Sequence, residues 1–192
     1  MITTLLATFV LGLAPQQQKL HITCAVTGED MEKAGATVLY RGSAYDMCCA
    51  GCANPFVKNP QKFLKEDRVK GRTVGVHLFD PVSGYAVKAE RAKAGPVVHN
   101  GVAYYFTSAE NKSAFEGNPK KFTAAPAKEA LYCPVMKEPV AKITDSGGYA
   151  DVNGVRYYIC CPGCLGTFKA DTKKYTGGDT TKHIKSVQTA KA

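Results

Sequence analysis

The sequence predicts an α+β protein of three small tandem modules, each a β-hairpin followed by one or two short helices. The first observation is a short motif that recurs, with starts at Cys24, Asp80 and Cys133 that are 56 and 53 residues apart. The second is a glycine-containing hairpin turn after each start, and the third is a pair of aromatic residues seven positions apart after each hairpin. We expect the modules at residues 19–66, 77–124 and 130–177.

Composition agrees with small folded modules and excludes several classes of protein. Of the 192 residues, 45% are hydrophobic and 21% charged, so disorder throughout is not expected. The 18 Gly and 10 Pro favour turns over a long helical bundle. The formal net charge is +9, but basic residues are mixed with acidic ones instead of forming one stripe, so we expect no nucleic-acid partner. Hydrolase and phosphate-binding motifs are missing from the sequence, and we expect no enzyme.

Residues 1–18 are expected to be a signal peptide. The segment 1–14 is uncharged and apolar, with the length of a signal-peptide core, and it is too short to span a membrane. The polar run Gln16–Gln18 then separates it from the folded part. We expect an exported protein, periplasmic or secreted, that contacts a membrane only if this segment stays uncleaved. The alternative is a buried N-terminal strand or helix.

Each module is expected to contain a hairpin that turns on a glycine. In the second and third modules the turn is Asn-Gly between β-branched and aromatic residues, which is the strongest short hairpin signal. Both central positions of a type I′ turn need a positive φ, which Asn and Gly adopt readily. The predicted turns are Arg41–Gly42, Asn100–Gly101 and Asn153–Gly154.

A helical segment is expected after each hairpin, followed by a second short helix. Two aromatic residues seven positions apart lie on one helical face and can cover the core under the hairpin. These pairs are Phe56 with Phe63, Phe115 with Phe122, and Phe168 with Tyr175. Between them lie N-cap signals for the second helix, Asn59–Pro60, Asn118–Pro119 and Asp171–Thr172. Residues 178–192 lack apolar periodicity and are expected to be a flexible tail.

The eight cysteines all fall in the first and third modules, and we predict that they bind metal. Each set has one cysteine at the module start and a Cys-Cys-x-x-Cys group where the last hairpin strand meets the helix. Such spacing brings ligands from distant segments together, and unpaired N–H groups at a helix start favour the thiolate that binds metal. The candidate ligands are Cys24, Cys48, Cys49, Cys52, Cys133, Cys160, Cys161 and Cys164.

Adjacent cysteines usually cannot both face one ion, which divides each set into primary and alternate ligands. The primary sets are Cys24, Cys48 and Cys52 in the first module and Cys133, Cys160 and Cys164 in the third, with Cys49 and Cys161 as alternates. The middle module has no thiol at the matching positions. Complete loss in one module and complete retention in two indicates that the cysteines act as a set, and the middle module is expected to fold without metal. Its matching residues are Asp80, Thr107, Ser108 and Asn111.

The ion is expected to be thiophilic, because soft thiolates select Cu(I), Zn(II) or heavier ions over magnesium and calcium. Three thiolates suit low-coordinate Cu(I), whereas zinc would need Cys49, Cys161, a histidine or water as fourth ligand. The four histidines lie outside the repeated ligand positions, and the methionines near the cysteines are expected to pack. These residues are His21, His77, His99 and His183, and Met31, Met47 and Met136.

Two other interpretations of the cysteines stay open. An exported chain with an even cysteine count normally forms disulfides, which would make the modules stapled interaction domains. The pairs Cys49–Cys52 and Cys161–Cys164 could also serve a thiol–disulfide oxidoreductase. Against the second interpretation, the sequence has no βαβ pattern and places two extra cysteines in each set.

The third module carries a family resemblance. Its pattern runs from Cys-Pro-Val-Met at Cys133 through Asn-Gly-Val-Arg-Tyr-Tyr-Ile-Cys-Cys-Pro-Gly-Cys to Asp171, and it resembles the YHS family and the related TRASH heavy-metal domains. The first module matches more loosely, the second is similar to the cysteine-free YHS branch, and together they cover most of residues 20–176.

The resemblance implies treble-clef-like modules that act in metal trafficking, resistance or storage, with a metal transporter or another exported protein as partner. Such modules often accompany copper pumps or regulators, whereas this chain has no pump, DNA-binding unit or catalytic domain. Cys24 and Cys48 are 24 residues apart and Cys133 and Cys160 are 27 apart, so the first site could differ in geometry.

Overall fold

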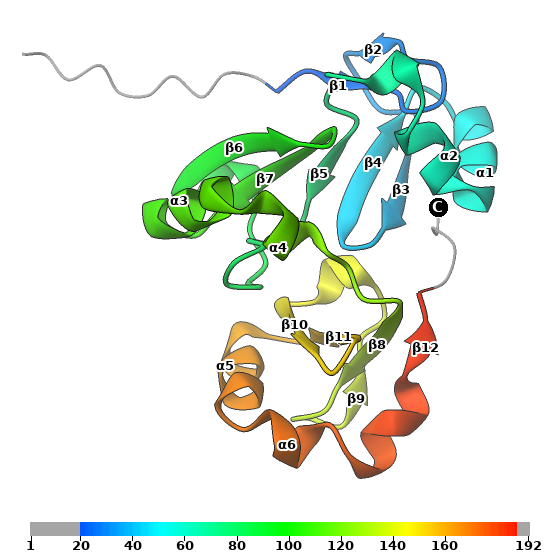
Figure 1. The fold of residues 1–192 in the computed structure, drawn as a ribbon. Coiled ribbons are helices and arrows are strands. Elements are labelled where there is room, and N and C mark those ends of the chain that lie inside the picture. Colours follow the sequence, from blue (N-terminus) through cyan, green and yellow to red (C-terminus); the bar gives the residue numbers. More distant parts are fainter. Residues whose placement is uncertain (1–19, 188–192) are drawn as a thin grey trace, which may run out of the picture.

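A β-hairpin followed by a nine-residue helix occurs three times in the chain (Figure 1). The computed structural model describes residues 20–187, so the predicted signal peptide lies outside the described residues. The fold is α+β with small sheets and short helices, as predicted. The hairpins are β3 (Ala36–Tyr40) with β4 (Ser43–Met47), β6 (Ala94–His99) with β7 (Val102–Phe106), and β10 (Gly148–Val152) with β11 (Val155–Ile159). The helices that follow are α1 (Ala50–Lys58), α3 (Ala109–Gly117) and α5 (Pro162–Ala170).

The hairpin turns lie where the sequence predicted them. Asn100 has a φ of 49° and Gly101 of 77°, so both central positions are in the left-handed region that a type I′ turn requires. Asn153 and Gly154 have the same conformation, with φ values of 50° and 77°. The first hairpin places Arg41 at a φ of 49°, a conformation that costs an arginine more than an asparagine.

A second short helix follows each long one, and its start is also confirmed. The three N-cap side chains accept a hydrogen bond from the backbone amide three residues later, as the sequence signals predicted. These helices are α2 (Pro60–Leu64) after Asn59, α4 (Pro119–Thr123) after Asn118, and α6 (Thr172–Tyr175) after Asp171.

The aromatic pairs form the same contact in all three segments. Phe56, Phe115 and Phe168 are completely buried beneath their hairpins. The rings seven residues later lie 6.2, 6.3 and 6.2 Å from them, with interplanar angles of 32°, 31° and 35°. Both rings of each pair face the core, as predicted, but they belong to two consecutive helices, so the turn between the helices and not the period of one helix brings them together.

The first two segments share one five-stranded sheet, in the order β3-β4-β5-β7-β6. Strand β5 (Gly75–His77) pairs with β4 in antiparallel and with β7 in parallel orientation, and thereby joins the two hairpins. One hydrophobic core, which contains both Phe56 and Phe115, runs beneath this sheet. A small hairpin, β1 (Ile22–Thr23) with β2 (Asp30–Met31), flanks it.

The third segment forms a sheet of its own, which lies below the first in Figure 1. Its strands follow the order β10-β11-β8-β12, with β9 paired to β8. Strand β8 runs parallel to β11, as β5 does to β7 in the first sheet. The additional strands are β8 (Lys128–Cys133), β9 (Glu138–Pro139) and β12 (Lys185–Ser186).

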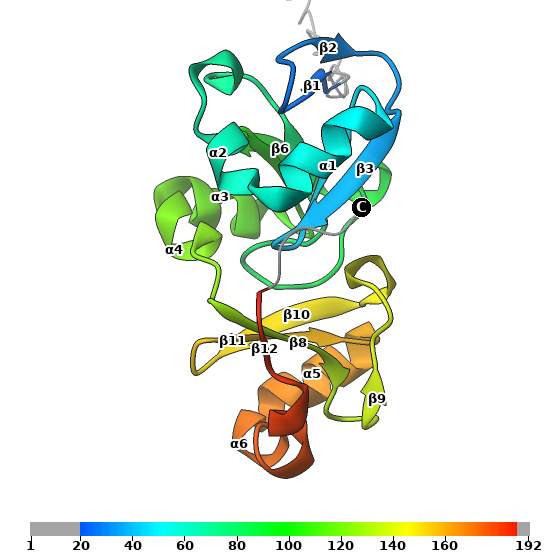
Figure 2. The same ribbon diagram turned by 90° about the vertical axis from the view of Figure 1, so that its right-hand side faces the viewer.

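Residues 178–187 are ordered, which corrects the prediction of a loose tail over this part of the chain. They form the 3-10 helix η4 (Gly178–His183) and strand β12, which pairs antiparallel with β8 (Figure 2). The His183 ring stacks on Tyr132 at 3.7 Å. The exposed edge of β8 offers unpaired backbone groups, and a two-residue strand satisfies them without any apolar periodicity.

Aromatic packing connects the two sheets, beside a buried arginine of the third segment. Phe79, which follows β5, packs against Tyr149 and Tyr158 of the third segment. Arg156 is 4% exposed, donates two 2.8 Å hydrogen bonds to Asp151, and lies 3.9 Å from the centre of the Tyr149 ring. The two cysteine-bearing segments are therefore parts of one packed structure. Among residues 20–187, no helix has both the length and the apolar character needed to cross a membrane.

Candidate metal centres

The residue that starts each repeat lies in the same tight turn in all three segments. The carbonyl groups of Cys24, Asp80 and Cys133 accept hydrogen bonds from the amides four residues later, at 2.8, 2.7 and 2.8 Å. The donor residues have positive φ values of 75°, 73° and 58°. All three starting side chains are completely buried, so each turn directs one side chain and several amides towards the helix.

The helix start supplies the other positions in the same way each time. The N-cap residues are Cys49, Ser108 and Cys161, and their φ values of −154°, −154° and −147° are typical of an extended cap. The residue before the cap ends the last hairpin strand, and the residue three positions after it lies in the first helical turn. Each segment therefore brings together side chains from a turn, a strand end and a helix.

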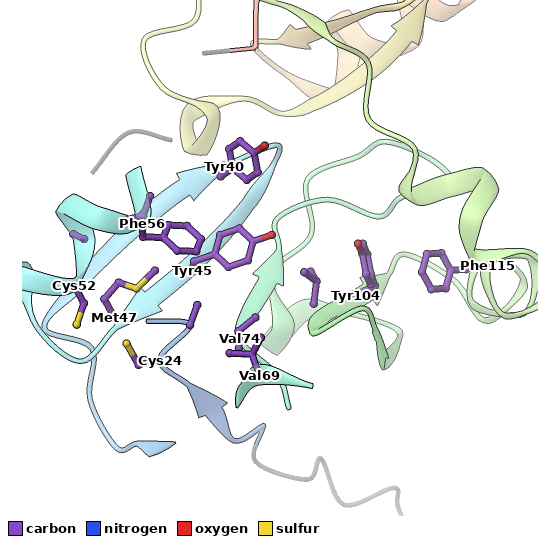
Figure 3. Packing of buried hydrophobic residues seen from close by; sticks show 14 of the residues in the cluster. Cys24, Tyr40, Tyr45, Met47, Cys52, Phe56, Val69, Val74, Tyr104 and Phe115 are labelled. Atoms are coloured by element: carbon purple, nitrogen blue, oxygen red, sulfur yellow. The ribbon is translucent and has the colours of Figure 1, made fainter. Parts of the chain in front are cut away.

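In the first segment three sulfur atoms meet. The Sγ atoms of Cys24, Cys48 and Cys52 all lie within 4.8 Å of one another, and the Cys48–Cys52 distance is 3.5 Å. Cys24 and Cys52 are buried at the edge of the first core (Figure 3), whereas Cys48 is half-buried. Sulfur atoms that share one ion at about 2.3 Å each lie about 4 Å apart, so this triad has the separation that a bound ion requires.

The third segment repeats the arrangement. Cys133, Cys160 and Cys164 also lie within 4.8 Å of one another, and the Cys133 and Cys160 sulfurs are 3.3 Å apart. Cys133 and Cys164 are buried and Cys160 is half-buried, the same pattern as in the first triad. Two cysteine triads within metal-binding distance are therefore present, despite the spacing of 24 residues in one and 27 in the other.

Backbone amides favour a thiolate at the buried end of each triad. Burial raises the pKa of Cys24, but hydrogen bonds from the amides of Cys48, Thr27 and Val26 outweigh it and lower the pKa to about 7. Burial likewise opposes the thiolate at Cys133, whose pKa is nevertheless lowered by backbone hydrogen bonds from the strand end and the turn. The cysteine pattern did not reveal these amides, although the glycine four residues after Cys24 is the signal for such a turn.

The thiols of the first helical turn, Cys52 and Cys164, and that of Cys160 before the cap have the opposite tendency. Burial, followed by hydrogen bonds to neighbouring sulfurs, raises the pKa of Cys52 and of Cys160. A hydrogen bond with Cys161, together with burial, raises the pKa of Cys164 to about 11. A metal ion must displace these protons to bind, so we expect its affinity to rise with pH across the neutral range.

The alternate cysteines differ between the two sites. Cys49 is exposed, and its Sγ lies 3.6 Å from the Sγ of Cys52 and 4.0 Å from that of Cys48. The adjacent residues Cys48 and Cys49 therefore both point towards Cys52, contrary to our expectation. Cys161 is half-buried, and its sulfur accepts a 3.3 Å hydrogen bond from the amide of Cys164. Neither belongs to the triad of its segment.

The middle segment has a hydrogen-bond network where the other two have thiols. The Asp80 carboxylate is completely buried and accepts hydrogen bonds from Thr107 Oγ1 at 2.5 Å, the Thr107 amide at 2.9 Å and Asn111 Nδ2 at 2.6 Å. The amides of Val82 and Ser83 bind its other oxygen at 2.9 and 3.2 Å. The network connects the same turn, strand end and helix that the cysteines connect elsewhere.

This carboxylate predicts an acid-sensitive middle segment. Burial raises the pKa of Asp80, but hydrogen bonds from Thr107, Asn111 and Ser83 outweigh burial, so the pKa lies below that of an ordinary aspartate. A lowered folded-state pKa stabilises the protein above the unfolded pKa of about 3.9, and this contribution is lost as the pH falls through the folded value.

We therefore expect the urea midpoint of the metal-free chain to decrease below about pH 4, and Asp80→Asn to remove part of that dependence. Urea melts between pH 7 and pH 3 measure it. Asp179→Asn is the matched control. Asp179 lies outside the middle segment, and it is an exposed acid whose pKa is lowered by the neighbouring Lys182. Equal pH profiles for the parent and Asp80→Asn would contradict the prediction.

The remaining predicted residues lie apart from the triads. His77 is buried, and burial together with Arg156 lowers its pKa to about 3, while Nδ1 lies 2.9 Å from Ser43 Oγ. No histidine of the described residues belongs to either triad. Met47 packs in the core as expected, whereas Met136 is 54% exposed, which corrects the expectation for that residue. All eight cysteines are free thiols.

Compared with known proteins, the chain matches no family model, no curated protein and no solved structure.

Proposed function

We propose that this protein is an exported, non-enzymatic carrier that binds one thiophilic metal ion in each cysteine triad, for metal trafficking, resistance or storage. The observation that carries the proposal is the convergence of three sulfurs within 4.8 Å, twice, from a turn, a strand end and a helix start. The middle segment supports it, because the same three positions hold a complete hydrogen-bond network there instead of isolated thiols.

The donor set favours Cu(I) or Zn(II) as the bound ion. Sulfur is the only ligand atom in either triad, and three soft thiolates match Cu(I) in a low-coordinate site. Zn(II) would complete a tetrahedron with water or with the neighbouring cysteine. The resemblance to YHS and TRASH domains implies that the modules are treble-clef-like. It also implies a partner that receives or supplies the ion, either a metal transporter or another exported protein.

Metal analysis of protein purified without oxygen, paired with a count of free thiols, tests the proposal. We expect two metal ions per chain, one for each triad, and eight free thiols after denaturation and chelation. Titration of the metal-free protein with Cu(I) or Zn(II) should show the same stoichiometry. A chain without metal and without free thiols would instead support structural disulfides.

A further inference from the structure

We infer that Cys49 gives the first site a second, outer sulfur triad, through which metal enters and leaves the buried inner triad. The outer triad consists of Cys48, Cys49 and Cys52, and the inner triad of Cys24, Cys48 and Cys52. This inference rests on the proposed function and adds a route for metal exchange. In the third segment the matching sulfur, that of Cys161, is held by a helix amide, so we expect the two sites to differ in exchange rate.

The three sulfurs of the outer triad are as close as those of the inner one. The Sγ distances are 3.5 Å for Cys48–Cys52, 3.6 Å for Cys49–Cys52 and 4.0 Å for Cys48–Cys49. These separations match the roughly 4 Å expected for sulfurs that share one ion. The outer triad can therefore hold the same kind of ion without rearrangement of the backbone.

Exposure increases from the inner to the outer ligand. Cys24 is completely buried, Cys52 is 7% exposed, Cys48 is half-buried and Cys49 is exposed. A metal donor or acceptor that supplies its own sulfur ligand can reach Cys49, whereas the folded chain covers Cys24. Exchange with another protein or with a chelator must therefore start at the outer triad.

The transfer between triads replaces one ligand. One metal–sulfur bond forms at Cys24 and one breaks at Cys49, while Cys48 and Cys52 stay bound throughout. Cys24 releases its proton, if it still carries one, and the freed Cys49 thiolate can take one up from water. The oxidation state of the ion does not change. Because two ligands are retained, the ion need not pass through a free, hydrated state.

In the third segment the extra cysteine is held differently, because its sulfur caps the helix in addition to interacting with the Cys164 thiol. Cys161 Sγ accepts the amide of Cys164, and Pro162 follows it at the first helical position. Cys49, by contrast, makes no side-chain cap bond to α1, and its sulfur points towards the neighbouring thiols. The chain thus contains its own comparison between an outer thiol that is free of the helix and one that a helix amide holds.

Two pairs of variants test the inference. Cys133→Ser isolates the first site. Cys48→Ser removes a sulfur common to the inner and outer triads and so isolates the third site. Serine at Cys49 is then combined with the first background and serine at Cys161 with the second. Serine is already the N-cap of the middle helix, where Ser108 accepts the amide of Asn111, so both caps should fold. Each protein receives one equivalent of Cu(I) without oxygen, and release to an excess of a chromogenic Cu(I) chelator is followed by stopped flow.

We expect Cys49→Ser to slow both loading and release at the first site by about tenfold or more, equivalent to about 1.4 kcal/mol in the barrier. The dissociation constant should change little, because Cys49 is not a ligand in the final state. Cys161→Ser should leave the rates of the third site unchanged.

Two other results with Cys49→Ser, one in the exchange rates and one in the affinity, would overturn the inference. Unchanged rates in Cys49→Ser would show that no outer triad takes part, and a loss of affinity as large as that from Cys24→Ser would make Cys49 a resident ligand. If the parent chain binds no Cu(I) at all, the proposed function fails for Cu(I), which is a different outcome from either of these.

Discussion

Replacing Cys133 with serine is expected to reduce the bound metal from two ions to one per chain and to destabilise the third segment. Cys133 is the buried member of its triad, and backbone hydrogen bonds lower its pKa, so it supplies a thiolate that serine cannot replace. Structural zinc sites in small domains contribute apparent binding free energies of about 10–16 kcal/mol, and this energy is also folding free energy. Elemental analysis and protection of the third segment against hydrogen exchange measure the two effects.

The first site provides the control for this substitution. Cys24, Cys48 and Cys52 pack against a different hydrophobic core, so the metal content of their site should stay at one ion per chain in Cys133→Ser. The reciprocal variant Cys48→Ser removes a sulfur common to both triads of the first site, so it should empty that site and preserve the third. Loss of both ions from either single variant would argue against two independent sites.

The same substitution separates a carrier from a dithiol oxidoreductase. An enzyme that uses Cys161 and Cys164 would keep both redox-active thiols in Cys133→Ser and would still reduce disulfide substrates. We expect no such turnover in the parent or in the variant. Turnover that survives Cys133→Ser and disappears in Cys161→Ser would replace the carrier interpretation with an oxidoreductase.

Replacing Asp80 with alanine is expected to lower the free energy of unfolding by about 3–5 kcal/mol. The variant leaves five donors without their acceptor, three of them backbone amides. Buried donors that lose a charged partner each cost about 1–3 kcal/mol before water or local movement compensates.

Urea unfolding of the metal-free chain measures this loss, and hydrogen exchange of the Thr107 amide localises it. Asp179→Ala is the control, because it removes an exposed carboxylate whose ion pair with Lys182 lies on the surface, and it should have little effect. Metal content should remain at two ions per chain in Asp80→Ala, since neither triad contains this residue. A change below about 1 kcal/mol would mean that the network does not hold the middle segment together.

Features that depend on neighbouring residues could be predicted from the sequence. The turn at Asn100–Gly101 and the cap at Asn118 are specified within a few positions, by φ preference and by hydrogen bonding to nearby amides. The Phe115–Phe122 contact is also local, although it joins two consecutive helices. The primary cysteine sets follow in the same way, because once the hairpin and helix form, the strand end and the first helical turn are adjacent. Cys24 and Cys133 join them through a turn whose geometry the repeat itself implies.

The pairing of segments needed the folded chain. Strand β5 has three residues and β12 has two, too few for a periodic pattern, and both are strands only because a neighbouring sheet edge offers unpaired backbone groups. The difference between Cys49 and Cys161 also appeared only in the folded chain, since identical spacing leaves one sulfur without a cap bond and the other bonded to a helix amide. Local chemistry thus determined which side chains could bind metal, and only long-range packing determined how deeply each is buried and which of them an outside ligand can reach.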